Sequence, residues 1–243
     1  MKKTSLTELH DLIGKSGVGS GDTVIVHADL RRFGLIENNA RDLVAMLLSI
    51  VGDTGTIITP SFTFSFPDIF DLKNSVSTTG SLTRLFSSHP DVVRVPDGMT
   101  SYYLIGHNAN RFISNWTNTS YGEGSIPDQI CSASGKVLQL GTDVLSHIHY
   151  LEEKVGVPYR KILRFEGLIV DGKDKYPSYT DFYARVKKVE KIIPDPIRVS
   201  FYARIDESMS TKSIVRSFDV DHFLEFSIPK LLENPSILVQ TYD

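Results

Sequence analysis

Two short apolar runs separated by a segment in helical register constrain the fold of this chain most strongly. The runs are Thr23–His27 and Gly55–Pro60, each of a length suited to a buried strand. Between them, behind a helix cap at Asn38 or Asn39, apolar residues recur at helical spacing, namely Leu43, Val44, Leu47, Leu48 and Val51. Strands separated by helices predict an α/β fold in which neighbouring strands run parallel.

The sequence predicts further strands of two kinds. Tyr102–Gly106 and Lys136–Gly141 continue the series of short buried strands. After Pro158 the predicted strands are longer and of antiparallel type, at Phe165–Val170, Ala184–Lys191 and Ile197–Ile205. We see no repeat, low-complexity segment or linker. We therefore expect a single domain over residues 1–243, with a mixed central sheet flanked by helices and an antiparallel C-terminal portion.

The composition argues against several classes of function. A net charge of −3 and an isoelectric point near 6.2 give no basic field for nucleic acid. A single cysteine, Cys131, excludes a disulfide framework and a multi-thiolate metal site. The N-terminus carries charge with no apolar stretch after it, so we expect no signal peptide, no membrane span and a cytoplasmic location.

An imidazole and a carboxylate follow the apolar run that ends at Gly141. His149 and Glu152 are three residues apart, which places both on one face of a helix, where the carboxylate can hold the ring. Such a pair suits a general base that removes a proton from an amine or a hydroxyl. A solvated helix face is the alternative, and His147 competes for the same role. His-x-His also occurs in metal sites, but no clear set of further ligands accompanies it, so we expect no metal.

Two loops carry groups that suit ligand binding. The loop His27–Gly34 combines backbone N–H groups with Arg31 and Arg32, and it can receive phosphate. The turn Tyr121–Ser125 places two glycines around Glu123, which permits the close approach of a ligand. The alternatives are a solvated loop in the first case and a plain turn in the second.

Five segments occur in one order along the chain: Gly21–Gly34, Gly55–Thr63, Gly80–Phe86, Tyr121–Ser125, and Gly135–Gly141 continued through His149–Glu153 to Gly156–Arg160. Together they resemble the aminoglycoside 3-N-acetyltransferase family, also called antibiotic N-acetyltransferases. The resemblance covers residues from about 21 to 160.

This resemblance implies an antibiotic N-acetyltransferase-like α/β fold and the transfer of an acyl group from acetyl-CoA, or another acyl-CoA, to the amine of an amino sugar. It implies that His149 is the catalytic histidine, with Ser146 where the family usually has threonine. Our own hypothesis is that Glu152 or Glu123 orients the ring. The resemblance also implies a binding site for the coenzyme A phosphates and pantetheine, made of His27, Ala28, Asp29, Leu30, Arg31, Arg32, Phe33 and Gly34, with Thr59 and Ser61. We count Ser146 among the residues that hold this donor. Asp29 departs from the family's serine and adds a negative charge there.

Charge bears on the identity of the acceptor. Aminoglycosides are polycations that favour a strongly acidic cleft, whereas this half of the chain carries several arginines, at Arg31, Arg32, Arg84, Arg94, Arg111 and Arg160. The diphosphate of a nucleotide-linked sugar needs such cations. We therefore expect a nucleotide-linked deoxyamino sugar for surface polysaccharide as the acceptor. The alternative is an aminoglycoside, with antibiotic resistance as the outcome.

Two rivals come from other classes of protein. One is a non-catalytic ligand-binding protein, and the other is a metal-dependent hydrolase that uses His147 and His149. The one oligomeric state that we consider is a homodimer.

Overall fold

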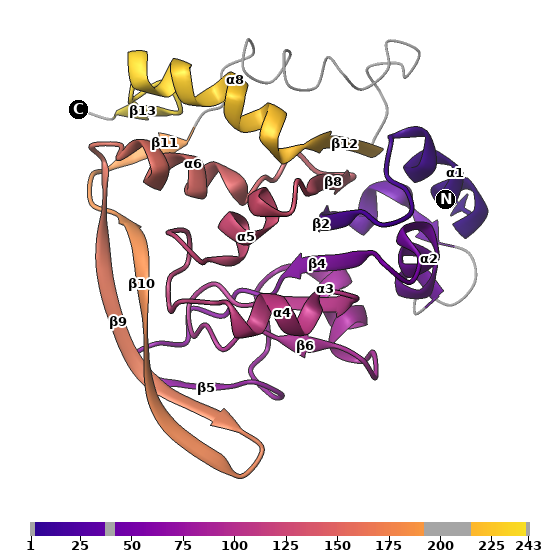
Figure 1. The fold of residues 1–243 in the computed structure, drawn as a ribbon, viewed down its shortest axis with the longest axis horizontal. Coiled ribbons are helices and arrows are strands. Elements are labelled where there is room, and N and C mark those ends of the chain that lie inside the picture. Colours follow the sequence, from indigo (N-terminus) through magenta and orange to yellow (C-terminus); the bar gives the residue numbers. More distant parts are fainter. Residues whose placement is uncertain (1–2, 37–41, 192–214, 242–243) are drawn as a thin grey trace.

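A mixed six-stranded sheet forms the centre of the molecule (Figure 1). The computed structural model describes residues 3–36, 42–191 and 215–241. The strands follow the order β12-β8-β2-β4-β7-β6, with the bounds Val215–Asp219, Lys136–Leu140, Thr23–Ala28, Thr56–Pro60, Tyr102–Gly106 and Val93–Arg94. β8, β2 and β4 are parallel neighbours, whereas β12, β7 and β6 pair antiparallel. The expected α/β fold with a mixed central sheet is confirmed.

Helices cover both faces of this sheet (Figure 1). One face carries α1, α2 and α3, at Leu6–Lys15, Asp42–Val51 and Gly80–Ser87, and the other carries α4, α5, α6 and α8, at Ala109–Ser114, Ile126–Ser132, His147–Val155 and Val220–Glu233. Side chains of β2 alternate between the two cores: Val24 and Val26 pack with the first group of helices, and Ile25 packs with the second. A strand buried on both faces has apolar residues in succession. For this reason β2 can be recognised in the sequence as an apolar run.

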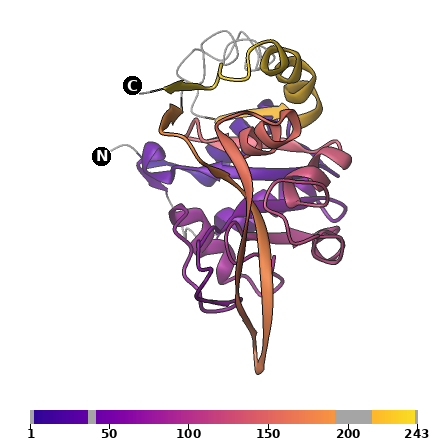
Figure 2. The same cartoon turned by 90° about the vertical axis from the view of Figure 1, so that its left-hand side faces the viewer.

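A long antiparallel hairpin stands beside the central sheet and projects beyond it (Figure 2). Its strands are β9, Arg160–Asp171, and β10, Asp174–Arg185, and β5, Ile69–Asp71, pairs parallel to β9. Two small sheets pair β1 with β3, at Lys3–Thr4 and Leu35–Ile36, and β11 with β13, at Val189–Lys191 and Val239–Thr241. The hairpin and the antiparallel pairing of β12 confirm the expected antiparallel C-terminal portion.

The details after Pro158 differ from the sequence-based expectation. The strand predicted at Ala184–Lys191 is wrong as one element, because β10 stops at Arg185 and β11 starts at Val189 in another sheet. Arg185 is the register partner of Arg160, where β9 begins, so β10 has no further residue of β9 to pair with. The strand predicted at 197–205 and the caps at Asn38 or Asn39 lie outside the described residues.

Among the residues that the structure describes, none of the helices has the length and apolar character needed to cross a membrane.

Candidate active site

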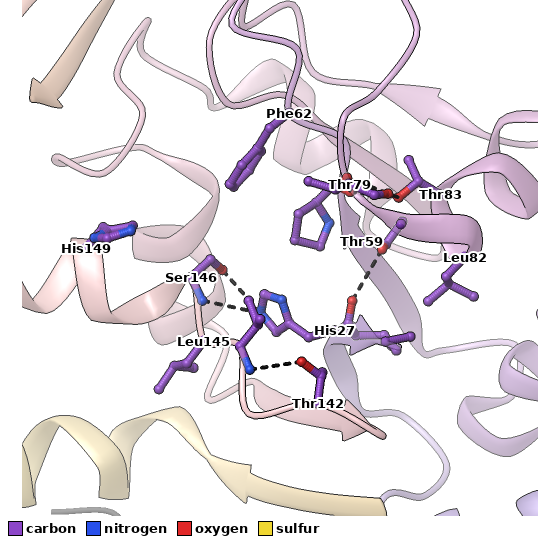
Figure 3. Close-up of a pocket in the computed structure, with 15 residues that line it drawn as sticks. His27, Thr59, Phe62, Thr79, Leu82, Thr83, Thr142, Leu145, Ser146 and His149 are labelled. Atoms are coloured by element: carbon purple, nitrogen blue, oxygen red, sulfur yellow. Dashed lines mark hydrogen bonds between the residues drawn. The ribbon is translucent and has the colours of Figure 1, made fainter. Parts of the chain in front are cut away.

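A cavity of about 280 Å³ opens at the carboxyl ends of the parallel strands (Figure 3). β2 contributes His27 and Ala28 to its wall, and β4 contributes Thr59 and Pro60. The rest of the wall comes from the segment after β4, from α3 with its N-cap, and from α6 with the segment that leads into it. It includes Phe62, Thr79, Thr83, Thr142, Leu145, Ser146 and His149. The chain leaves β2 for β4 on one side while β8 lies on the other. Ligands bind at such a switch point in open α/β sheets.

His149 enters this cavity from α6 with a carboxylate bonded to its ring. Its Nδ1 lies 2.6 Å from Oε2 of Glu152, one helical turn further along the same face. The Glu152 side chain is 1% exposed, whereas that of His149 is 22% exposed. With Nδ1–H donating to the carboxylate, Nε2 is the basic nitrogen of the neutral ring. The three-residue spacing thus brings the imidazole and the carboxylate into contact, as the sequence predicted.

Further groups complete the surroundings of Glu152. Nε of Arg160 lies 2.8 Å from its Oε2, and Nη2 of the same guanidinium lies 3.1 Å from Nδ1 of His149. The hydroxyl of Tyr159 donates to Oε1 at 2.9 Å. Arg160 is itself held by a bond from Nη1 to the carbonyl oxygen of Tyr183, also at 2.9 Å. Both oxygens of Glu152 are thus occupied, which fixes the carboxylate against the ring.

Tyr121 packs against the ring of His149. Its ring centroid lies 5.2 Å from that of His149, with the planes tilted by 57°. Burial raises the pKa of the Tyr121 hydroxyl, so this group stays protonated at neutral pH. Sequence reasoning missed Tyr121, Tyr159 and Arg160 as site residues. All three lie in the segments that carry the family resemblance, which was the signal that could have found them.

His27 and Ser146 meet at the base of the cavity (Figure 3). Nε2 of His27 lies 3.3 Å from Oγ of Ser146 and 3.5 Å from its backbone nitrogen. Both residues are 5% exposed. Four of the residues predicted to hold the donor therefore line the cavity together with His149, namely His27, Ala28, Thr59 and Ser146.

The remaining residues of the predicted donor loop lie outside the wall of this cavity. Residues 30–33 form a short 3-10 helix, η1 (Leu30–Phe33), in which Asp29 caps the backbone N–H of Arg31. The Asp29 carboxylate also pairs with the Arg31 guanidinium at 2.8 Å, so its negative charge is compensated locally. That guanidinium lowers the pKa of Asp29.

Phe33 is not placed for ligand contact, because its side chain is 1% exposed and packs in the core with α1 and α2. Arg32 is exposed, and its Nε donates to the carbonyl oxygen of Gly141 at 3.4 Å. Leu30 and Gly34 also lie outside the wall, as does Ser61, which follows β4 in the chain and is fully buried.

Glu123 has an exposed side chain and does not line the cavity. The contact with His149 runs through Glu152 instead. The glycines around Glu123 have structural reasons: Gly124 has a φ of +78°, and a Cβ there would lie 2.5 Å from Thr117. The predicted ligand turn thus delivers Tyr121, rather than Glu123, to the site.

His147 faces the protein interior, as two positions along a helix predict. Its side chain is fully buried, and burial lowers the pKa of its imidazole to about 4. Within the described parts of the chain, no group of three or more His, Cys, Asp or Glu side chains could hold a metal ion. The rival metal site built on His147 and His149 therefore finds no support in the arrangement of the side chains.

Comparison with known proteins gives a consistent result. The model of the family described as aminoglycoside 3-N-acetyltransferase matches residues 25–227. An aminoglycoside N(3)-acetyltransferase III from Serratia marcescens is 27% identical over 200 residues, which cover 72% of this chain and 73% of that protein.

Two solved structures share the fold. The first, AAC-IIIb in a binary complex with CoASH, has a TM-score of 0.79 at 21% identity and covers 96% of this chain and 97% of its own. The second, AAC-VIa bound to sisomicin, has a TM-score of 0.74 at 21% identity and covers 95% of this chain and 98% of its own.

Proposed function

Because this chain belongs to the aminoglycoside 3-N-acetyltransferase family, we propose that it transfers an acetyl group from acetyl-CoA to an amine of an aminoglycoside. The observation that carries the proposal is the 2.6 Å contact between His149 and Glu152 at the mouth of the cavity. It supplies an oriented base beside a space for the thioester.

Family membership confirms the resemblance seen in the sequence. It also confirms the expected enzyme class, an acyl-CoA-dependent N-acyltransferase with acetyl-CoA as cosubstrate, in place of a non-catalytic ligand-binding protein. The nucleotide-linked sugar acceptor expected from net charge gains no support, because the matching proteins are aminoglycoside acetyltransferases. We therefore favour the alternative acceptor, an aminoglycoside, over a sugar for surface polysaccharide.

The proposed reaction is a direct transfer between two bound substrates. Nε2 of His149 takes a proton from the acceptor amine as the nitrogen attacks the thioester carbonyl. Glu152 holds the ring through Nδ1 and stabilises the imidazolium that forms. The same ring then returns the proton to the departing thiolate of coenzyme A. Tyr121 limits the tilt of the ring through its packing contact.

The donor is proposed to reach His149 through the cavity. Its wall is mostly apolar near Leu145 and Phe62 and offers hydroxyls at Thr59 and Thr79, which suits a pantetheine arm with its amides. The phosphates would then lie further out, where Arg31 and Arg32 are exposed.

This placement of the donor stays a prediction. The single domain over residues 1–243 and the homodimer also stay predictions.

Thiol release with acetyl-CoA tests the proposal. The acceptors are sisomicin and a nucleotide-linked amino sugar, and the variants are His149→Ala and His107→Ala. His107 is an exposed histidine at the end of β7 and serves as the matched control. We expect turnover with sisomicin, a loss of roughly 10²- to 10⁴-fold in kcat for His149→Ala, and wild-type turnover for His107→Ala. Calorimetry should show that His149→Ala still binds coenzyme A.

Two results would contradict the proposal separately. Turnover of the nucleotide-linked sugar without turnover of any aminoglycoside would reject the acceptor and keep the chemistry. Undiminished kcat in His149→Ala would reject His149 as the base.

A further inference from the structure

Phe64 combines an unusual backbone conformation with an exposed aromatic ring. It lies in the segment after β4 and has a φ of +50°, in the left-handed region that a bulky residue rarely adopts. Glycine is the usual residue for such a position. Phe64 is nevertheless 50% exposed, so burial in the core does not explain why an aromatic residue stands there.

Backbone hydrogen bonds hold Phe64 in this conformation. The N–H groups of Thr63 and Phe64 both donate to the carbonyl oxygen of Met99, at 3.2 and 3.0 Å. The N–H of Ser65 donates to the carbonyl oxygen of Gly98 at 2.7 Å. A residue in an unfavourable conformation persists where its surroundings determine it, and such residues concentrate at sites that bind ligands.

The ring of Phe64 belongs to a row of aromatic side chains that leads to His149. Phe64 meets Phe62 edge to face, with 6.1 Å between the ring centroids and 77° between the planes. It meets Phe182 of β10 in the same manner, at 6.1 Å and 84°. Phe182 in turn lies 5.8 Å from Tyr121, and Tyr121 lies 5.2 Å from His149. The exposed ring is therefore connected to the proposed base by direct ring contacts.

Phe62 marks the boundary between this row and the cavity proposed for the donor. Phe62 lines the cavity together with His149 (Figure 3), whereas Phe64 lies outside the wall. If the pantetheine arm fills the cavity, the acceptor has to approach His149 from a direction that the donor leaves open. The exposed ring of Phe64, beyond Phe62, offers a surface for that approach.

The chemistry of this surface suits the face of a sugar ring. The side chains of Phe62, Phe64 and Phe182 are apolar and carry no hydrogen-bonding group. A sugar ring presents C–H groups on its faces and its polar groups around its edge. Stacking on phenylalanine thus buries the apolar part and leaves the amines at the edge. Protonated amines that do not react gain further attraction from the aromatic faces.

We propose that Phe64, supported by Phe62 and Phe182, binds the face of the amino-sugar ring that carries the reacting amine, and so directs this amine toward His149. The proposal rests on the proposed function and adds a subsite for the acceptor. A purely structural role, in which the ring of Phe64 only packs the loop against β10, is the alternative. That role affects stability and leaves the KM for the acceptor unchanged.

Steady-state kinetics of Phe64→Ala, Phe64→Gly and Phe64→Tyr test the proposal, with sisomicin and a nucleotide-linked amino sugar as acceptors. Tyr176→Ala is the matched control, because Tyr176 is 39% exposed and lies near the tip of the β9–β10 hairpin. We expect Phe64→Ala and Phe64→Gly to raise the KM for the acceptor roughly tenfold or more, with the KM for acetyl-CoA little changed. Phe64→Tyr keeps the aromatic ring and should behave as the wild type, as should Tyr176→Ala.

The alanine and glycine variants separate the ring from the backbone. Both lack the ring, but glycine adopts a positive φ without strain and alanine does not. Phe64→Gly should therefore melt roughly 2–4 °C above Phe64→Ala, while the two share the same raised KM for the acceptor. A glycine variant with the wild-type KM would overturn the proposal, because the ring would then have no part in binding.

Turnover of sisomicin with an unchanged acceptor KM in Phe64→Ala would also overturn the proposal, and it would leave the proposed function intact. If the wild type acetylates only the nucleotide-linked sugar, the proposed acceptor fails. The same variants, assayed with that sugar, then decide the role of Phe64. Calorimetry in which neither sugar binds to the wild type would reject both proposals.

Discussion

His147 and His149 stand two residues apart on α6 and have opposite surroundings. His149 reaches the cavity and is oriented by Glu152, whereas His147 is fully buried on the other face. Helical geometry alone separates the two rings, since positions two apart do not share a face. The spacing in the sequence shows that the two rings lie on different faces, but it does not indicate which face is buried. The family resemblance predicts His149 as the catalytic residue, and the fold buries His147.

The buried ring of His147 makes stability depend on pH. Burial lowers its pKa to about 4, below the value near 6.5 expected in the unfolded chain. Between those values the unfolded chain binds a proton at this position and the folded chain does not, so stability falls as pH falls. The difference corresponds to about 3 kcal/mol of unfolding free energy lost between pH 6.5 and 4. Urea unfolding of the wild type and His147→Leu across this range measures it.

We expect the wild type to lose about 3 kcal/mol more than His147→Leu over that interval. Carboxylates titrate in both proteins, so the comparison cancels their contribution. Parallel pH profiles for the two proteins would show that His147 is protonated in the folded state.

At the scale of elements, one buried carboxylate joins α6 to the start of β9. Glu152 belongs to the helix, while Tyr159 and Arg160 belong to the turn and strand that follow it. The C-cap at Gly156, with a φ of +75°, ends α6 in the left-handed conformation, just before the turn that leads into β9. The bonds that orient the ring of His149 therefore also connect the two elements.

Replacing Glu152 by glutamine should weaken both stability and catalysis. The variant leaves the Arg160 side chain, which is 6% exposed, without its negative partner. Breaking a buried ion pair on one side costs about 3–5 kcal/mol. The ring of His149 also loses its charged acceptor, so kcat should fall by roughly 10²- to 10⁴-fold. Urea unfolding and thiol release measure the two effects.

Arg164→Gln provides the matched control. Arg164 pairs with Asp181 at the same distance, 2.8 Å, but its side chain is 52% exposed. An exposed pair contributes about 0–1 kcal/mol, so this variant should unfold nearly as the wild type does. Equal losses in the two variants would mean that burial does not set the strength of the Glu152 pair.

Local patterns predicted much of this fold and part of the site. The short strands and the His149–Glu152 pair follow from spacing within a few residues of sequence. Arg160 could not be derived in this way, because its contact depends on how the chain turns after α6. The family resemblance places Phe33 in the predicted donor loop, whereas the 3-10 turn directs its ring into the core.

At the scale of the whole molecule, net charge carries little information about the acceptor. The chain carries 26 basic and 29 acidic residues, which leaves a net charge of −3. That sum says nothing about where charges meet. Two carboxylates have basic partners: Glu152 pairs with Arg160, and Asp181 with Arg164. A weak overall field is compatible with a polycationic acceptor that is held by short-range contacts.

These pairings predict a weak salt dependence for the reaction with sisomicin. Electrostatic steering needs unpaired charge of one sign around the cleft, and salt screens it strongly. Burial raises the pKa of Glu153, next to Glu152, to about 7, so this carboxyl is only partly ionised at neutral pH and adds little to the field. We expect kcat/KM to fall by less than about tenfold between about 50 and 200 mM salt. Initial rates at pH 7, at sisomicin concentrations below KM, measure this ratio. A fall of about a hundredfold would show that acidic groups concentrate a strong field at the cleft in spite of the pairs seen here.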